Sequence, residues 1–334
     1  MDIDAAGVAA AFGLGRPVGE WRPLANGDHP SDSRVLTTVR GRWVVRSGRL
    51  LGDWHRRHAW RVHTLESAAW RAGIPMPRPV APPSPAVGYW HNPHGDALVR
   101  VSEWLEGHDL RRPGAGADAA AWAGDALGRI ALLDTAADLG PEDEPALHPL
   151  SDWHEWVAEA EAGDSPVAGP ARSLLPVVED ATGRVREARR SQPGTVLVHG
   201  DTSRTNVLRT ATGYALIDWE SARADVPWWE AVNVGFRFAT PFNGPTADGD
   251  PRMVRPLIAA YLDRGGPGGP ADVSAFAGML RSQLAVIAWC LWLALGHRQA
   301  DAARRDFGRR IVASAAREMP RVLRSLDGWA TLLR

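Results

Sequence analysis

The sequence contains no lysine, so all 38 of its Lys-or-Arg positions are arginine. This absence excludes a Walker-type phosphate loop, which needs a Gly-Lys-Ser/Thr sequence, and chemistry through a lysine Schiff base. The single cysteine, Cys290, excludes an internal disulfide framework and a cysteine-based metal cluster, and it predicts a reducing, intracellular setting. A net charge of −1 provides no basic field that would attract nucleic acid.

Long apolar runs are also scarce. The longest, Leu284–Leu295, is shorter than the roughly 20 residues that a membrane span needs, so we expect a buried helix there. The first ten residues, MDIDAAGVAA, lack the basic start and apolar core of a secretory signal. These features predict a cytoplasmic protein whose partners include neither nucleic acid nor a membrane.

Two common hydrolytic sites are missing as well. No G-x-S-x-G sequence is present, which argues against a serine hydrolase of the α/β type. The 11 histidines are dispersed and form no HExxH motif, which argues against a zinc site. His55 and His58 are neighbours on a predicted helix, and we expect both to face solvent.

The first hundred residues are rich in strand patterns. Asp4 is placed to cap a short helix that continues to Phe12. Two β-rich runs are joined through Arg40–Trp43, where Gly41 suits the first central position of a type II′ hairpin. The remaining predicted elements of this part are the strands Val35–Val39 and Trp43–Val45, the helix His55–Arg71 and a hairpin of Val87–Trp90 with Leu98–Val101.

Composition changes from strand-like to helix-like at Ser102–Gly107. We therefore predict a nucleotide-binding lobe at 1–101, a hinge at 102–107 and a catalytic and substrate-binding lobe at 108–334. The predicted helices of the second lobe are Ala117–Ala137, Ser151–Ala162, Ala171–Ser191, Trp228–Phe238, Arg252–Arg264, Val273–His297 and Ala302–Leu333. The fold class is α+β, with a small β-rich lobe and a larger, mainly helical one.

The segment Thr195–Glu220 has the strongest chemical signal. Three polar residues, Asp201, Asn206 and Asp218, follow or precede its strand-like runs Val196–Val198, Val207–Leu208 and Tyr214–Ile217. Such a set can present a base to a hydroxyl and two oxygen ligands to Mg²⁺, which suits phosphoryl transfer. Any one of the three taken alone would be read as a turn or cap residue. Their combined register favours a site.

The first lobe offers groups that could contact a nucleotide. Arg46 ends a strand and would point a cation at phosphates, and Glu66 is the acid on the following helix that could pair with it. The turn-rich loop Ala25–Ser31 could cover phosphates with backbone N–H groups, or it is an ordinary hairpin loop. The backbone of Ser102–Trp104 would hydrogen-bond a base. The alternatives are an exposed Arg46 and a solvated Glu66.

His199-Gly-Asp201-Thr-Ser-Arg-Thr-Asn206, followed by Ile217-Asp218-Trp-Glu220, resembles the aminoglycoside phosphotransferase superfamily, small-molecule kinases of protein-kinase-like fold. Weaker marks are Gly73–Pro77, Glu103–Gly107 and Ala224–Pro227. The resemblance implies that Asp201 is the catalytic base and that Asn206 and Asp218 hold Mg²⁺. It further implies that Arg46 contacts the phosphates of ATP or GTP where relatives have Lys or Arg, anchored by Glu66. His199 would organise the loop without titrating in the reaction.

The acceptor stays open at this point. The resemblance implies a small-molecule hydroxyl, on an antibiotic such as an aminoglycoside or macrolide with a role in resistance, or on an amino sugar or choline-like metabolite. Because Glu66 lies late in its helix and the phosphate loop has little glycine, a silent nucleotide-binding pseudokinase is the other alternative.

Two features of the second lobe bear on the acceptor. Eight of the 16 tryptophans follow position 150 and would either stack on a substrate or pack in the core. Glu220, Asp225 and Glu230 could attract a cationic acceptor, and the alternative for Asp225 and Glu230 is that they brace the continuation of the metal loop.

Overall fold

The computed structural model describes residues 3–24, 33–50, 52–93, 96–111, 116–133, 135, 147–191, 194–239, 250–297 and 300–334. The chain forms two compact units. The first comprises Met1–Gly114, Leu132–Ala136 and Leu197–Arg223, and the second comprises the remainder. The predicted phosphate loop Ala25–Ser31 lies outside the described residues. The lobe boundary at Ser102–Gly107 stays a prediction.

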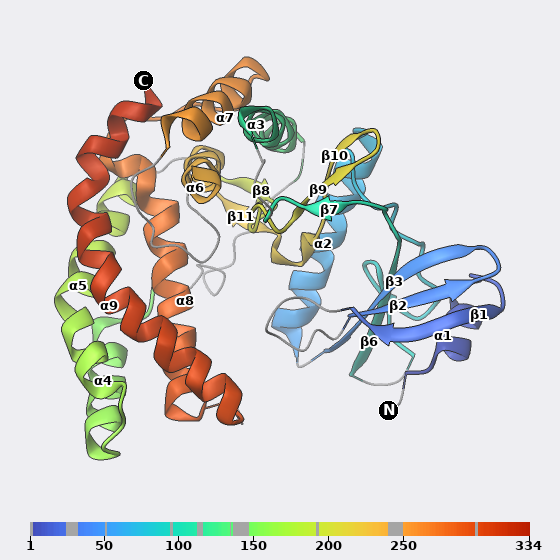
Figure 1. The fold of residues 1–334 in the computed structure, drawn as a ribbon, viewed down its shortest axis with the longest axis horizontal. Coiled ribbons are helices and arrows are strands. Elements are labelled where there is room, and N and C mark those ends of the chain that lie inside the picture. Colours follow the sequence, from blue (N-terminus) through green and yellow to red (C-terminus); the bar gives the residue numbers. More distant parts are fainter. Residues whose placement is uncertain are drawn as a thin grey trace. The chain divides into compact units, whose positions relative to one another are not determined.

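The first unit is built on a six-stranded sheet with the order β1-β2-β3-β6-β5-β4 (Figure 1). Every neighbouring pair of strands is antiparallel, so short connections join most of them. The strands are β1 Pro17–Pro23, β2 Ser33–Thr38, β3 Gly41–Arg49, β4 Ala86–Val87, β5 Trp90–His91 and β6 Ala97–Glu103.

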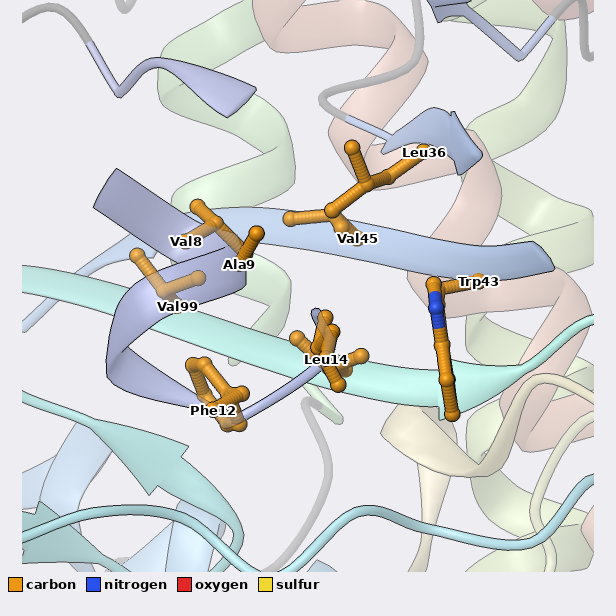
Figure 2. Close-up of a cluster of buried hydrophobic side chains, with 9 residues drawn as sticks. Val8, Ala9, Phe12, Leu14, Leu36, Trp43, Val45 and Val99 are labelled. Carbon is orange, nitrogen blue, oxygen red and sulfur yellow. The ribbon is translucent and has the colours of Figure 1, made fainter. Parts of the chain in front are cut away.

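A short N-terminal helix, α1 (Ala5–Ala11), covers part of this sheet. Asp4 caps it as predicted, since its carboxylate accepts a hydrogen bond of 2.7 Å from the Gly7 amide. Val8 and Phe12 from the helix region pack with Leu36 and Val45 of the sheet (Figure 2). This apolar cluster joins the helix to β2 and β3 through burial from water.

The turn between β2 and β3 lies two positions before the predicted one. Thr38 pairs with Gly41, so the two-residue loop is Val39-Arg40, and Gly41 follows it with φ +149°. The Thr38 hydroxyl explains the shift: it donates to the Leu14 carbonyl at 2.6 Å and accepts from the Arg40 amide at 3.2 Å. A side-chain hydrogen bond within the turn therefore overrides the glycine signal.

The long helix α2 (Asp53–Arg71) follows β3 and matches the predicted helix within two residues. Its Ala59 packs with Val87, Trp90 and Leu98 of the outer strands. Glu66 is buried on the same helix, at 1% exposure, which is unusual for an acid and requires a charged partner.

A second sheet of this unit has the order β10-β9-β7. β9 (Val207–Thr210) and β10 (Gly213–Leu216) form an antiparallel hairpin in which Val207 is opposite Leu216. β7 (His108–Asp109) pairs with β9, and β8 (Val196–Val198) pairs with β11 (Arg223–Asp225) in a two-stranded sheet. The three strand-like runs of the central motif are thus confirmed as β8, β9 and β10.

The second unit is helical, as the sequence predicts (Figure 1). Its helices α3 and α7 cross so closely that a Cβ on Gly124 would lie 2.0 Å from the Leu257 carbonyl oxygen. The elements are α3 Ala117–Ala131, α4 Leu150–Ala162, α5 Ala168–Arg190, α6 Pro227–Ala239, α7 Pro251–Asp263, η3 Val273–Phe276, α8 Ala277–Leu295, α9 Ala302–Ala330 and η5 Thr331–Leu333. The predicted end of the first of these, Ala137, lies outside the described residues.

Helix α8 contains the longest apolar run. Together with η3 it forms a segment, Val273–Leu295, that is long and apolar enough to cross a membrane by length and composition alone. In the most apolar 18-residue stretch of this segment, 61% is buried within the protein, as is typical of a core helix. The expectation of a buried helix is confirmed, although Val286 and Trp289 are exposed.

Candidate active site

The site begins at the loop after β8, where His199 is completely buried. Its Nδ1 accepts a hydrogen bond from the Asp201 amide at 3.3 Å, and its Nε2 lies 3.1 Å from the Ile217 carbonyl oxygen and donates to it. This pattern requires the neutral imidazole. Burial lowers the pKa of His199 to about 4, so the ring stays neutral at physiological pH.

Asp201 and Asn206 are joined directly. The Asn206 side-chain amide donates from Nδ2 to the carboxylate Oδ2 of Asp201 and to its backbone carbonyl, both at 2.8 Å. These two bonds fix the amide, so that its other atom, Oδ1, is turned away from Asp201. Two residues that the sequence places in one site are therefore in contact.

Asp218 is brought to the same end of the β9–β10 hairpin. The Ile217 amide donates to the Asn206 carbonyl at 2.9 Å, continuing the pairing of the hairpin by one step. Asp218 then adopts the left-handed conformation, with φ 67° and ψ 61°. Such a backbone is uncommon outside glycine and is often kept at functional sites.

These residues fit a magnesium ion. Asn206 Oδ1 makes a long contact of 3.5 Å with the Thr205 hydroxyl, and Asp218 supplies a carboxylate. Oxygen donors of this kind are what Mg²⁺ prefers, and Mg²⁺ usually takes its other ligands from water and phosphate. Within the described residues no group of three or more His, Cys, Asp or Glu could hold a metal ion, so a closed protein cage is absent there.

Arg46 lies inside β3, which continues to Arg49 instead of ending at Arg46 as predicted, and its side chain contacts the loop that carries Asp218. Its Nη1 lies 2.8 Å from Asp218 Oδ1, and it forms a second ion pair with Glu220 of η2 (Trp219–Ser221). Burial alone would lower the pKa of Arg46, but the Glu220 and Asp218 carboxylates outweigh it and raise that pKa. The predicted phosphate contact and the predicted metal ligand are thus neighbours.

The predicted pairing of Arg46 with Glu66 is wrong. Glu66 forms a buried ion pair with Arg100 of β6, and Arg100 Nη1 also binds Glu220 Oε1 at 2.7 Å. The reason is register: Arg100 lies directly opposite Arg46 across β3 and β6, so two cations were available to one helix acid. Glu66 remains within the electrostatic influence of Arg46.

Burial and charge oppose each other at the acids of this cluster. Burial raises the pKa of Glu66 despite Arg100, and it raises the pKa of Glu220 to about 7 despite the two arginines. For Asp218 the balance is reversed: burial would raise its pKa, but the hydrogen bond with Glu220 and the Arg46 charge hold it well below the usual range. Asp218 is therefore the anionic member of the pair.

The predicted hinge is closely tied to the sheet. The Trp104 amide donates to the Arg42 carbonyl at 2.9 Å, so this N–H is already used. The Trp104 indole donates to Glu106 at 2.8 Å, and the Arg42 guanidinium lies 4.5 Å from its ring centre. Ser102 pairs with Val44 of β3. Base contacts by Ser102 and Trp104 stay a prediction.

Several residues considered for substrate binding have structural partners. Asp225 is buried in an ion pair with Arg281, and Glu230 is 3% exposed, so neither offers a free charge to a cationic acceptor. Arg204 donates to the Leu110 carbonyl at 3.1 Å. His58, expected to face solvent, lies 2.7 Å from the Glu220 carbonyl oxygen.

The late tryptophans serve mainly as core. Five of them are less than 7% exposed: Trp153, Trp219, Trp228, Trp229 and Trp329. Trp156 and Trp292 pack edge to face with a centroid distance of 5.4 Å. Only Trp289 of the eight is among the exposed large apolar residues, at 44% exposure. The stacking of these rings on a substrate stays a prediction.

Arg100 and Glu220 are the site residues that the sequence interpretation missed or misassigned. A signal for Arg100 was present, because it is a single charge within the apolar run Leu98–Val101 of a strand. A charge in such a position is rarely tolerated without a buried partner. Glu220 was considered only as an attractor for substrate, yet it pairs with both arginines.

Gly200 provides a first testable prediction. It has φ +82°, and a Cβ there would lie 2.1 Å from the Ser221 carbonyl oxygen. Gly200→Ala is therefore expected to destabilise the protein by about 2 kcal/mol or more in chemical unfolding. Gly13→Ala is the matched control, with φ +64° and no atom within 4 Å of the Cβ. Equal losses in the two variants would show that the close contact has no effect.

His199 provides a prediction on pH. Because its folded pKa of about 4 lies below the unfolded value near 6.5, the unfolded state binds more protons between these pH values. The stabilisation is complete above pH 6.5 and is lost as pH falls towards 4, on the order of 3 kcal/mol. In His199→Gln this part of the pH dependence should disappear, as measured by urea unfolding at each pH. Identical slopes for the two proteins would contradict the assignment.

A β-sheet unit that carries a buried His-Gly-Asp loop and a hairpin flanked by Asn206 and Asp218, together with a helical unit, is the architecture of a kinase-like phosphotransferase. The chain belongs to the phosphotransferase enzyme family, whose model (APH) matches residues 20–275. The protein is thus a phosphotransferase, and the predicted family and enzyme class are confirmed.

Solved structures confirm the fold. A spectinomycin phosphotransferase in complex with ADP and spectinomycin has a TM-score of 0.66 at 11% identity, covering 96% of this chain and 99% of that one. An amicoumacin kinase in complex with AMP-PNP and Ca²⁺ has a TM-score of 0.59 at 12% identity, with 95% of each chain covered. A choline/ethanolamine kinase family protein from Mesorhizobium loti has a TM-score of 0.57 at 21% identity, with 98% of each chain covered. A search of curated proteins gave no match.

Proposed function

We propose that the protein transfers the γ-phosphate of ATP or GTP to a hydroxyl group of a small molecule, with Mg²⁺ as cofactor. The observation that carries the proposal is the contact of Asp201 with Asn206, at the hairpin end that also presents Asp218 to Arg46. A base, two oxygen ligands and a phosphate-binding cation are then all within the first unit. Two of the similar solved structures are complexes with ADP or AMP-PNP, which supports a nucleotide donor.

Asp201 would orient the acceptor hydroxyl and accept its proton. A carboxylate suffices because the transition state is loose and the proton leaves late. The two hydrogen bonds from Asn206 hold Asp201 in one orientation, and His199 holds its backbone. Positioning of this kind removes much of the entropic barrier.

Asn206 Oδ1 and the Asp218 carboxylate would hold Mg²⁺, which when bound neutralises charge on the triphosphate. Arg46 would exchange its contact with Asp218 for phosphate oxygens, and Glu220 is placed to keep it nearby. Because a guanidinium presents several donors in a plane, Arg46 can contact two oxygens at once from two nitrogens, a planar geometry that the single nitrogen of a lysine does not provide.

For the acceptor, we propose an antibiotic hydroxyl first, which would make the protein a cytoplasmic resistance or self-protection enzyme. Spectinomycin and amicoumacin are named with two of the similar structures, which supports this class. A choline-like or amino-sugar metabolite is the second candidate, supported by the likeness to the Mesorhizobium loti protein at 21% identity.

The test is a panel of acceptors with the 334-residue protein, Mg²⁺ and γ-labelled ATP or GTP. Aminoglycosides, spectinomycin, macrolides, choline, ethanolamine and amino sugars are compared, with the Asp201→Asn protein as background. We expect labelled product with one acceptor class and none with the variant. Nucleotide binding without transfer to any acceptor would favour a silent binding protein.

A further inference from the structure

We propose that Arg100 is a positioning residue for phosphoryl transfer, which holds the metal-ligand loop and Arg46 in place through Glu220. The inference rests on the proposed function and deepens it. Arg46 was predicted to pair with Glu66 of the helix, but Arg100 makes that pair instead. Arg46 is held by Glu220.

The strand register makes this arrangement necessary. Arg46 and Arg100 are direct cross-strand partners in β3 and β6, and like charges in this relation repel each other. Both side chains are largely buried, with side-chain exposures of 24% and 7%. Two buried cations at one register position persist only if carboxylates compensate them.

Three carboxylates provide the compensation in a continuous series. Glu66 binds Arg100, Arg100 binds Glu220, Glu220 binds Arg46, and Arg46 binds Asp218. Each arginine thus contacts two of the three carboxylates, and Glu220 is the acid that the two arginines share.

The series connects α2 to the metal-ligand loop. Glu66 comes from the C-terminal half of α2, whereas Glu220 lies in η2, two residues after Asp218. A second link is the His58 Nε2 atom of α2, 2.7 Å from the Glu220 carbonyl oxygen. Arg100 is the member that binds an acid from each element, through Nη2 to Glu66 and Nη1 to Glu220.

This geometry suits arginine and not lysine. The two terminal nitrogens of one guanidinium contact two different carboxylates, and a planar fork can hold both at fixed separation. A lysine would retain the charge but present a single nitrogen. Arg100→Lys therefore tests the fork, and Arg100→Met tests the charge.

The experiment compares Arg100→Met and Arg100→Lys with Arg49→Met. Arg49 is on the same strand as Arg46 and pairs with Asp96 at the surface, with a side-chain exposure of 72%. We expect Arg100→Met to weaken Mg²⁺–nucleotide binding about tenfold and to lower kcat by on the order of 10²-fold, with the acceptor KM unchanged. Arg100→Lys should recover part of this loss, and Arg49→Met should match the wild type.

A merely structural role would lower the Tm of Arg100→Met while leaving Kd and kcat of the folded protein unchanged, and this result would overturn the proposal. If Arg100 acts through Glu220, the double variant Arg100→Met/Glu220→Gln should have nearly the same kcat as the single variant Glu220→Gln. Losses that multiply in the double variant would also overturn it.

Amide hydrogen exchange provides a readout that does not depend on activity. We expect faster exchange at Ile217 and Ala222 in Arg100→Met, because their hydrogen bonds to Asn206 and Trp219 carbonyls close the loop. Unchanged exchange would contradict the positioning role even if the wild type transfers phosphate. If exchange is faster in Arg100→Met but the wild type binds no nucleotide, the result would support the role of Arg100 in holding the loop and would contradict the proposed function.

Discussion

Replacing Asp201 by asparagine is expected to lower kcat for phosphate transfer by about 10²–10⁴-fold, the range that a positioned general base contributes. The variant removes the basic oxygen but keeps the shape of the side chain. Asn206 Nδ2, which donates to Asp201 Oδ2 at 2.8 Å, can donate equally to the new amide oxygen. We therefore expect wild-type nucleotide affinity and an unchanged fold. The measurement is kcat with the acceptor that the panel identifies.

Asp180→Asn is the matched control for this substitution. Asp180 lies on α5 in the second compact unit, is 46% exposed and pairs with Arg184 one turn away, so its substitution removes one surface charge that has no part in the proposed site. Its kcat should equal that of the wild type. A loss of less than tenfold in Asp201→Asn would show that Asp201 is not the base.

Asp218→Asn is expected to abolish the Mg²⁺-dependent part of nucleotide binding. The substitution removes the charged ligand and leaves Asn206 as a neutral one, and Mg²⁺ binds neutral oxygens poorly in place of water. Asparagine tolerates the left-handed backbone at φ 67°, so the loop should be retained. In the wild type, Mg²⁺–nucleotide at 100 times its Kd should stabilise the fold by about 2.7 kcal/mol. That stabilisation should vanish in the variant.

Removal of the metal is the control for this prediction. Wild-type protein with nucleotide and a chelator should show the same weak binding as Asp218→Asn with Mg²⁺. Calorimetric titration under the three conditions gives the comparison. Mg²⁺-dependent binding that survives in the variant would place the metal ligands elsewhere.

The parts of the site that the sequence predicted depend on contacts close in the chain. Asp201 and Asn206 are five residues apart and share one loop, and Asp218 follows the hairpin that begins after Asn206. Short connections and a tight hairpin leave few alternatives for these residues. Spacing alone is informative for such local structure.

The parts that it did not predict depend on long-range pairing. The partner of Glu66 is decided by which residue of β6 faces Arg46, and that register is not visible in one sequence. Asp225 similarly finds Arg281, 56 positions along the chain. Its position in the sequence placed Asp225 near the site, but its burial and its ion pair with Arg281 determine its role.

The central claim is that Asn206 and Asp218 hold the magnesium ion of a bound nucleotide beside Asp201. A crystal structure with Mg²⁺ and a non-hydrolysable triphosphate tests it most directly. We predict an ion about 2.0–2.1 Å from Asn206 Oδ1 and from an Asp218 oxygen, with Arg46 on phosphate oxygens. An ion bound without either side chain, or a nucleotide whose γ-phosphate lies away from Asp201, would contradict the account.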